Sequence, residues 1–179
     1  MSATEVIKFW FEDIEPKQRF TKDPDFDELI RSKFSKTHDR AADGLLYKWR
    51  DHPLDALAEV IVLDQFSRNM FRDSNNAFAY DTLALVLAQE AVRRKLDAEL
   101  EPTQKAFLYM PFMHSESREI HELALFLFDQ PGLEDNYNFE LKHKLIIDRF
   151  GRYPHRNAIL NRDSTPDEVE FLKQPGSGF

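Results

Sequence analysis

The chain has 179 residues, long enough for one domain with a sizeable core, and its 16 Phe, 5 Tyr and 2 Trp supply large side chains for that core. It has no cysteine, which excludes disulfides, thiolate metal sites and cysteine nucleophiles. The formal net charge is −8, yet residues 142–162 hold six Lys and Arg against one acid. An acidic chain with one basic segment argues against general nucleic-acid binding. It is compatible with a local anion site, or with a basic segment that pairs with acidic neighbours.

The N-terminal residues and the lengths of the apolar runs indicate the cellular location of the protein. Residues 1–13 carry four charged side chains, which is not the pattern of a secretory signal. The longest unbroken apolar runs, 83–88 and 123–128, are too short to span a membrane. We therefore expect a cytoplasmic protein that does not contact a membrane.

The hydrophobic pattern is helical along almost the whole chain, and alternating runs typical of strands are nearly absent. Proline in first turns and glycine after helical stretches mark the expected helix ends. The pattern predicts helices at 4–11, 24–42, 54–71, 76–95, 103–113, 116–129, 139–150, 154–160 and 166–173. Short connections favour antiparallel helix pairs, and no internal repeat is evident. We expect a single all-α domain, 1–179, with a frayed tail at 174–179.

The expected helix 54–71 becomes polar in its second half, on the arc that is apolar in its first half. Asp64 and Arg68 are one turn apart, and so are Arg68 and Arg72, which repel each other unless an anion lies between them. These three residues and Asn69 are candidate ligand-binding residues. A solvated helix face explains the same pattern equally well.

A second polar cluster follows the apolar stretch that ends before His114. His114 and Glu116 are the candidate acid–base pair, because imidazole and carboxylate side chains can exchange protons near neutral pH. The alternative is a simple helix start, in which Ser115 is the N-cap and Arg118 and Glu122 form a surface ion pair.

The third cluster, Arg149–Asn157, places three arginines, a histidine and an amide around Gly151 and Pro154. Arginine presents a planar fork of donors that suits carboxylate or phosphate, and a helix N-terminus at Pro154 favours an anion as well. The candidate ligand-binding residues here are Arg152, His155 and Arg156. The alternative is architectural, with the cluster tying the last helices to earlier carbonyls and carboxylates.

The sequence predicts no metal site and no cofactor. His114 and His121 are seven residues apart, whereas a helical zinc motif places its two histidines one turn apart. His143 lies on an apolar stripe, so we interpret it as a core histidine with its hydrogen bonds satisfied. Ser115 lacks the strand–turn–helix context of a serine nucleophile.

Three blocks, residues 64–69, 107–116 and 149–157, resemble the signature blocks of the bacterial-type domain of unknown function 924 family. The resemblance implies an all-α, right-handed superhelix of antiparallel helix pairs like that of tetratricopeptide repeats, and it implies no reaction. The chain departs from the family pattern at Ser67, where proline is usual, and at Asn161, where glycine is usual. The first departure predicts a less kinked helix 54–71, and the second bears on the turn before Arg162.

Two functional hypotheses result. The first is a site for a small anion, carboxylate or phosphate, which could also be catalytic and which requires the three blocks to meet in one concavity. The second is a helical scaffold that binds a peptide or protein in an exposed apolar groove, without enzymatic activity. The arginines beside histidines favour the first, since a peptide groove does not need them. Reaction, substrate and oligomeric state are not fixed by the sequence.

Overall fold

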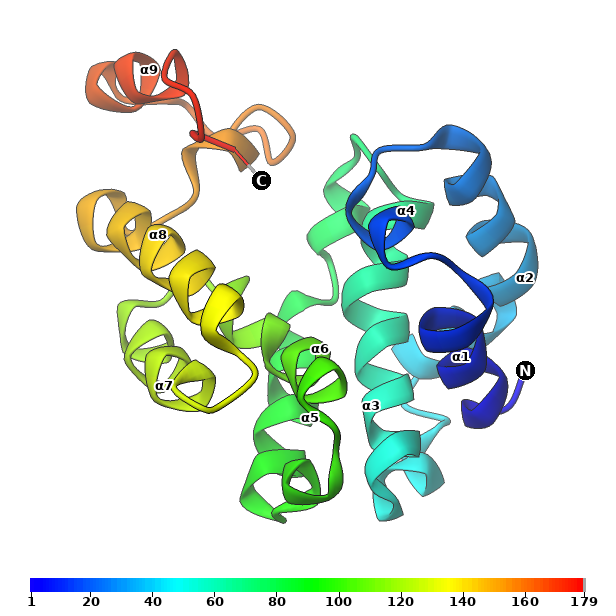
Figure 1. Ribbon diagram of the computed structural model, residues 1–179. Helices are drawn as coiled ribbons and strands as arrows, with labels where there is room; N and C mark the ends of the chain where they lie inside the picture. Colours follow the sequence, from blue (N-terminus) through cyan, green and yellow to red (C-terminus); the bar gives the residue numbers. More distant parts are fainter. Residues whose placement is uncertain (179) are drawn as a thin grey trace.

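In the computed structural model, which describes residues 1–178, every regular element is a helix (Figure 1). The α-helices are α1 (Ala3–Lys8), α2 (Pro24–Ala42), α3 (Pro53–Ile61), α4 (Ser67–Met70), α5 (Asp81–Arg93), α6 (Pro102–Met113), α7 (Arg118–Phe128), α8 (Glu134–Phe150) and α9 (Pro166–Leu172). Two π-helical segments extend neighbouring helices, η1 (Phe9–Asp13) and η4 (Val62–Phe66). Five short 3-10 helices complete the described part: η2 (Pro16–Phe20), η3 (Tyr47–Asp51), η5 (Asn75–Phe78), η6 (Leu96–Glu99) and η7 (Pro154–Arg156).

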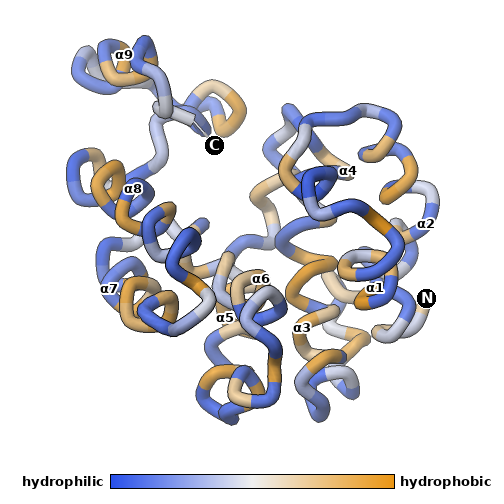
Figure 2. The backbone as a smooth tube through the Cα atoms, in the orientation of Figure 1, coloured by the Kyte–Doolittle hydropathy of each residue, from blue (hydrophilic) through white to orange (hydrophobic). Residues whose placement is uncertain are grey.

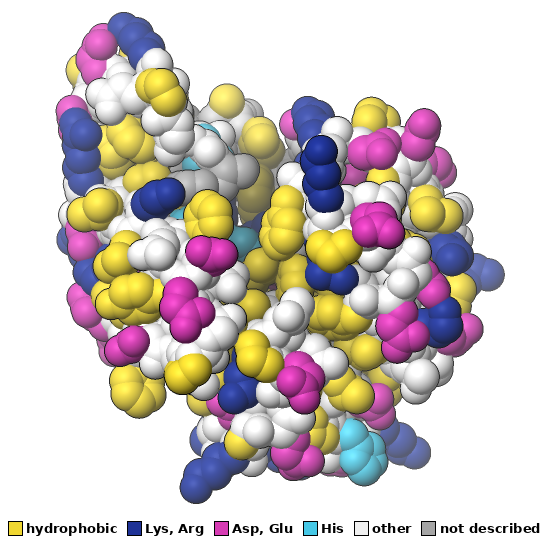
Figure 3. Space-filling view, in the orientation of Figure 1, with side chains coloured by type: hydrophobic (Ala, Val, Ile, Leu, Met, Phe, Trp, Pro, Cys, Tyr) yellow, Lys and Arg dark blue, Asp and Glu magenta, His cyan; other side chains and the backbone are white. Residues whose placement is uncertain are grey.

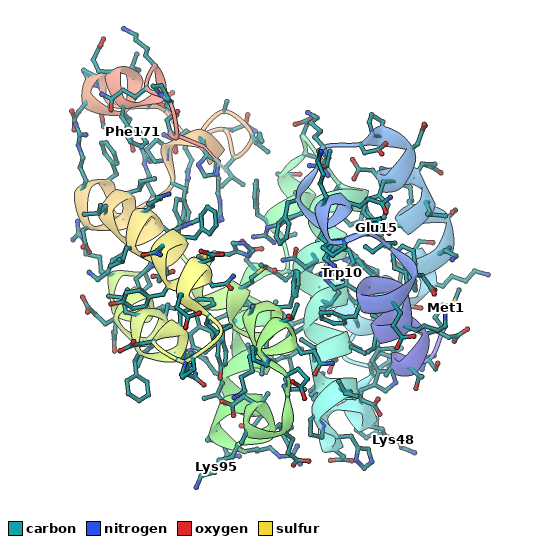
Figure 4. The ribbon with its side chains drawn as sticks, viewed as in Figure 1. Met1, Trp10, Glu15, Lys48, Lys95 and Phe171 are labelled. Atoms are coloured by element: carbon teal, nitrogen blue, oxygen red, sulfur yellow. The ribbon has the colours of Figure 1, made fainter. Side chains whose placement is uncertain are left out.

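The core is built around α3, which packs against α1, α5 and α6. All side chains from Ala56 to Leu63 are buried, as expected for a helix that is apolar on nearly all sides (Figure 2). Trp10, labelled in Figure 4, packs edge-on against Phe66 and Phe107 at 5.5 and 5.6 Å between ring centroids. These aromatic contacts hold the first helix against the middle of the chain.

The C-terminal part leans away from the N-terminal part, as Figure 1 shows. We call α1 to α5, with their connecting segments, the N-terminal body, and α8, η7 and α9 the C-terminal arm. Helix α7 packs along α8, and α6 joins both to the body. The space-filling view shows a hollow between arm and body, with histidine side chains in it (Figure 3). The contact of Asp64 with His114, and those of Arg68 and Arg156 with Asp81, bring the three polar blocks together.

Most predicted helices are confirmed, and the exceptions have local causes. Helix α2 has the predicted bounds, whereas α8 begins at Glu134, five residues before the predicted 139. The predicted helix 154–160 is wrong, because only Pro154–Arg156 forms a helix, and it is a single 3-10 turn. Other short 3-10 helices were not predicted, since a single turn has no hydrophobic period.

The start of α7 differs from the prediction. The helix begins at Arg118 with Ser117 as its N-cap residue, so the prediction that Ser115 is the N-cap is wrong. Ser115 Oγ instead accepts a hydrogen bond from the backbone N–H of Ser117 at 3.2 Å. The expected Arg118–Glu122 pair is not formed. Arg118 donates to two carbonyls at the end of α8 at 3.3 and 3.0 Å, and Glu122 pairs with Lys144 at 2.8 Å.

The two departures from the family pattern are both accommodated. Asn161 has a φ of 52°, in the left-handed region that glycine and, less often, asparagine adopt. Ser67 lies directly after the π-helical segment η4, and its hydroxyl donates to Leu63 O at 2.6 Å. The turn before Arg162 is therefore formed without glycine, and the helix continues through Ser67 into α4.

Two remaining predictions concern the ends and the surface. Among the helices that the structure describes, none is long and apolar enough to cross a membrane. Of the tail 174–179, residue 179 lies outside the described residues. The preceding residues form a turn in which Ser177 Oγ donates to Leu172 O at 3.2 Å. A Cβ placed on Gly178 would lie 3.5 Å from His155 Cβ, so the tail reaches the edge of the hollow.

Candidate functional site

Arg68 connects the buried Asp64 with the half-buried Asp81, which belong to different elements. Its Nη1 lies 2.9 Å from Asp64 Oδ1 and donates to Asp81 Oδ1 at 2.9 Å, and its Nη2 donates to Asp81 Oδ2 at 3.0 Å. Arg156, from η7 in the arm, then donates through Nη1 to Asp81 Oδ2 at 3.3 Å. His114, at the end of α6, lies against the other end of this chain of contacts. We call Asp64, Arg68, Asp81, His114 and Arg156 the central cluster.

Asp64 is held by η4 in the interior and has no exposed surface. Its Oδ1 lies 2.7 Å from His114 Nδ1, and its Oδ2 accepts a hydrogen bond from the side-chain amide of Gln65. Burial disfavours the charged carboxylate, but the charge of Arg68 and the hydrogen bonds from His114 and Gln65 outweigh burial and hold the pKa of Asp64 well below its usual value. Asp64 is therefore ionised over the whole physiological pH range.

The ionised carboxylate fixes the tautomer of His114. A carboxylate can only accept hydrogen bonds, so Nδ1 of His114 carries the hydrogen and Nε2 of the neutral ring carries the lone pair. Burial and, next, the positive charge of Arg68 lower the pKa of His114, which keeps the ring neutral at pH 7. The side chain is 17% exposed, and within residues 1–178 the hydrogen bond of its ring is the one at Nδ1.

Arg156 is the least satisfied cation of the cluster. Its side chain is only 7% exposed, and its guanidinium lies over the rings of Phe78 and Tyr153, 4.6 Å from each centroid. Both oxygens of its partner Asp81 already accept from Arg68. Its Nε is buried and has no acceptor within residues 1–178. Burial, followed by repulsion from Arg68, lowers the pKa of Arg156. A buried guanidinium thus has donor capacity that the described residues leave unused.

Histidine and tyrosine side chains form the wall next to Arg156. The ring of His155 lies 5.5 Å from that of Tyr153, and burial, with Arg156 next, lowers the pKa of His155 to about 4. Tyr153 is fully buried and donates its hydroxyl hydrogen to Met113 O at 2.6 Å. His143 donates from Nδ1 to Phe139 O at 2.8 Å, which confirms the predicted core histidine.

Glu116 is not the partner of His114. It accepts two hydrogen bonds from Arg162, at 2.6 and 2.9 Å, and a third from the backbone N–H of Tyr153 at 2.7 Å. These contacts tie the segment after η7 to the segment before α7. The expected acid–base pair of His114 and Glu116 is therefore not formed, and Asp64 takes the place of its carboxylate.

Three other candidates lie outside the central cluster. Asn69 donates to Asp27 at 2.8 Å, and Arg72 pairs with the same carboxylate at 2.5 and 2.8 Å, which fixes α4 on α2. Arg152 pairs with Glu168 at 2.7 and 2.8 Å and holds α9. The helix N-terminus expected at Pro154 is a three-residue 3-10 helix, too short to concentrate positive potential on an anion.

Two residues of the site lie outside the three polar blocks, namely Asp81 and Phe78. Asp81 begins α5, where an acid in the first turn of a helix is common for reasons of helix electrostatics. Phe78 ends the short helix η5, and one phenylalanine among 16 carries no distinguishing signal. Only the folded chain shows that both face Arg156.

The central cluster is balanced in formal charge but not in hydrogen bonds. Arg68 and Arg156 offset the two carboxylates of Asp64 and Asp81, while His114 is neutral. The unsatisfied hydrogen-bond donor is the Nε–H group of Arg156. Chemically, the arrangement offers a guanidinium for an oxygen pair and an imidazole nitrogen with a lone pair.

Comparison with known proteins agrees with the helical architecture. The family model described as a bacterial protein of unknown function (DUF924) matches residues 6–176. A solved structure from Agrobacterium tumefaciens, a protein of unknown function named ATU0120, is similar to the chain with a TM-score of 0.91 and 36% sequence identity. The alignment covers 96% of each chain. A search of curated proteins found no match. The family model spans nearly the whole chain, and the chain therefore belongs to the DUF924 family of bacterial proteins.

Proposed function

We propose that the central cluster binds a small anion, a carboxylate or a phosphate, with Arg156 as the principal contact. The observation that carries the proposal is the buried Nε of Arg156, which has no acceptor among the described residues. Nη1 is engaged with Asp81, so Nε and the neighbouring Nη2 form the edge that would receive two oxygens of a ligand.

The surroundings of Arg156 support an organic anion of modest size. The rings of Phe78 and Tyr153 cover the guanidinium and exclude water from it, which strengthens an ion pair formed there. Arg68 adds a second positive charge close by, because both guanidiniums donate to Asp81 Oδ2. A bound anion would relieve this repulsion and satisfy the remaining donor.

Thermal unfolding in the presence of acetate, phosphate or chloride at equal ionic strength tests the proposal. We expect acetate or phosphate to raise Tm saturably, since a ligand that binds only the native state adds about 2.7 kcal/mol at 100 times its Kd. Chloride serves as the reference for general salt effects. The anion that produces the larger rise in Tm at equal concentration shows whether the site prefers a carboxylate or a phosphate.

Two variants locate the binding. Arg156→Lys keeps the charge but removes the two-donor edge, so the anion-dependent rise in Tm is expected to disappear. Arg149→Gln is the matched control, because Arg149 belongs to the same sequence block but pairs with Asp167 on the surface. An equal response of wild type and Arg156→Lys would exclude Arg156 as the contact.

The second candidate function is a scaffold that binds a peptide or protein, and it has its own supporting observation. Phe126 in α7 and Leu145 in α8 are 79% and 69% exposed, unusual for large apolar side chains. We rank it second because the buried polar cluster has no part in it.

We further propose that the helix pairs follow a right-handed, tetratricopeptide-like superhelix within a single domain, and that the cysteine-free chain works in the cytoplasm.

A further inference from the structure

We infer that His114 is a general base that faces the anion site, with Asp64 as its positioning residue and a small carboxylic acid as the bound molecule. The inference rests on the proposed anion site and adds a reaction step to it. Its basis is the hydrogen bond of 2.7 Å between Asp64 Oδ1 and His114 Nδ1. This bond leaves the lone pair on Nε2, and within residues 1–178 the hydrogen bond of the ring is the one at Nδ1.

The other buried histidines show why His114 is different. His121 uses both ring nitrogens, Nδ1 toward Glu140 at 2.5 Å and Nε2 toward Ser115 O at 2.8 Å. His38 Nε2 lies 2.7 Å from the hydroxyl of Ser67, in a side chain that is 2% exposed. Hydrogen bonds to the protein thus engage both ring nitrogens of His121 and Nε2 of His38. His114 alone among these three combines a carboxylate on one nitrogen with access to solvent.

The geometry of Asp64 is that of a side chain that orients another. Its carboxylate is completely buried, accepts from His114 and Gln65 and forms an ion pair with Arg68, so neither the carboxylate nor the imidazole can rotate freely. When Nε2 takes up a proton, the positive charge of the imidazolium lies next to an ionised carboxylate. Asp64 therefore stabilises the protonated ring without touching the substrate.

Arg68 relates this base to the anion site. A single guanidinium reaches Asp64 on one side and Asp81 on the other, and Asp81 is the residue that Arg156 contacts. His114 and Arg156 thus lie at the two ends of one short chain of contacts. The inference requires that a molecule whose carboxylate binds Arg156 extends along this chain of contacts to Nε2 of His114.

The proposed step is a proton transfer. The bond that breaks joins a hydrogen to another atom of the bound molecule, X, outside the carboxylate that Arg156 holds. The electron pair of this bond stays on X, and the proton goes to Nε2 of His114. The imidazolium then returns a proton to the product or to water, which restores the neutral ring. No oxidant or further reactant is needed.

Alkylation by bromoacetate and 3-bromopropionate tests the inference without knowledge of the substrate. Each reagent carries a carboxylate for Arg156 and an electrophilic carbon. Nε2 attacks that carbon, the carbon–bromine bond breaks and bromide leaves. The chain has no cysteine, so thiols cannot compete for the reagent. We expect saturable alkylation of His114, mapped by peptide mass spectrometry, at least tenfold faster than that of exposed His52.

Four comparisons make the result decisive. Acetate should protect His114 but not His52, and neutral bromoacetamide should react with both at similar rates. Arg156→Lys should abolish saturation. Asp64→Asn should slow the reaction of His114 and move its pH midpoint to lower pH, an effect that a merely structural role of Asp64 would not produce.

The outcomes separate the two proposals. If acetate raises Tm through Arg156 but His114 is alkylated no faster than His52 by either reagent, the general-base inference is wrong and the anion site stands. If neither acetate nor phosphate raises Tm and acetate does not protect His114, the anion site itself is wrong; if phosphate alone raises Tm, the carboxylic acid of this inference is wrong and the anion site stands. Saturable alkylation that depends on Arg156 supports both.

Discussion

At the scale of single residues, Asn161 holds a left-handed turn conformation at a φ of 52° that glycine usually supplies in this family. Its side chain is exposed to solvent. Left-handed backbone costs other L-residues about 1–2 kcal/mol. We expect Asn161→Ala to lower the free energy of unfolding by about 1 kcal/mol, measured by urea denaturation. Asn161→Gly should change it by no more than a few tenths, and equal effects of both would show that the turn is unstrained.

The sequence identifies the polar residues of the site but not their partners. Asp64, Arg68, His114 and Arg156 stand out because charged and polar side chains interrupt helical apolar patterns. Arg72 and Arg152 stand out in the same way, yet they pair with Asp27 and Glu168. Pairing is decided by which helices pack together, and one sequence carries no information on such distant contacts.

At the scale of elements, the helix that the pattern predicts as 54–71 contains the π-helical segment η4. Hydrophobic periodicity detects a helix, but a π turn shifts the period by one residue over a length too short to recognise. Ser67 follows this segment. Its hydroxyl donates to Leu63 O at 2.6 Å, so its oxygen is left to accept from Nε2–H of His38 at 2.7 Å.

Loss of the Ser67 hydroxyl should therefore be costly. Ser67→Ala leaves a donor of the buried His38 without an acceptor, and an unsatisfied buried polar group costs about 1–3 kcal/mol. We expect a decrease of that size in the free energy of unfolding, measured by urea denaturation. Ser32→Ala is the matched control, because Ser32 makes the same kind of bond to Leu29 O on an exposed face. Comparable losses in both variants would contradict a special role for the buried network.

At the scale of the whole molecule, several buried histidines make stability depend on pH. Burial lowers the pKa of His143 to about 3 and that of His155 to about 4, and it also lowers the pKa of His114 and His38. The unfolded chain binds protons near the usual histidine pKa of 6.5, whereas the native state does not. The contribution of these histidines to the free energy of unfolding is therefore fully present above about pH 6.5 and is lost as the pH falls toward 4.

Urea denaturation between pH 7.5 and 5 measures this loss. Each such histidine contributes up to about 1.4 kcal/mol per pH unit below 6.5. His143→Phe, which keeps an aromatic ring, should make the decline shallower, while His52→Gln at an exposed position should leave it unchanged. A curve for His143→Phe parallel to that of the wild type would exclude His143 from the effect.

The all-α architecture is predictable from the sequence, whereas the arrangement of the arm is not. Helical periodicity, proline in first turns and Gly151 at the end of α8 identify most elements. The position of the arm depends on contacts such as that of Arg156 with Asp81, 75 residues earlier in the chain. Such contacts depend on the three-dimensional packing of the helices.

The same contact has a kinetic consequence. Arg156 belongs to the arm, while Asp81 and Phe78 belong to the body, so a molecule held by Arg156 is enclosed by two parts of the chain. Swinging the arm outward would break the guanidinium–carboxylate and guanidinium–ring contacts together and release the occupant in the same event. Residence time would then follow the opening rate of the arm, and weakening the contact with Phe78 would shorten it even where the affinity-determining donors are intact.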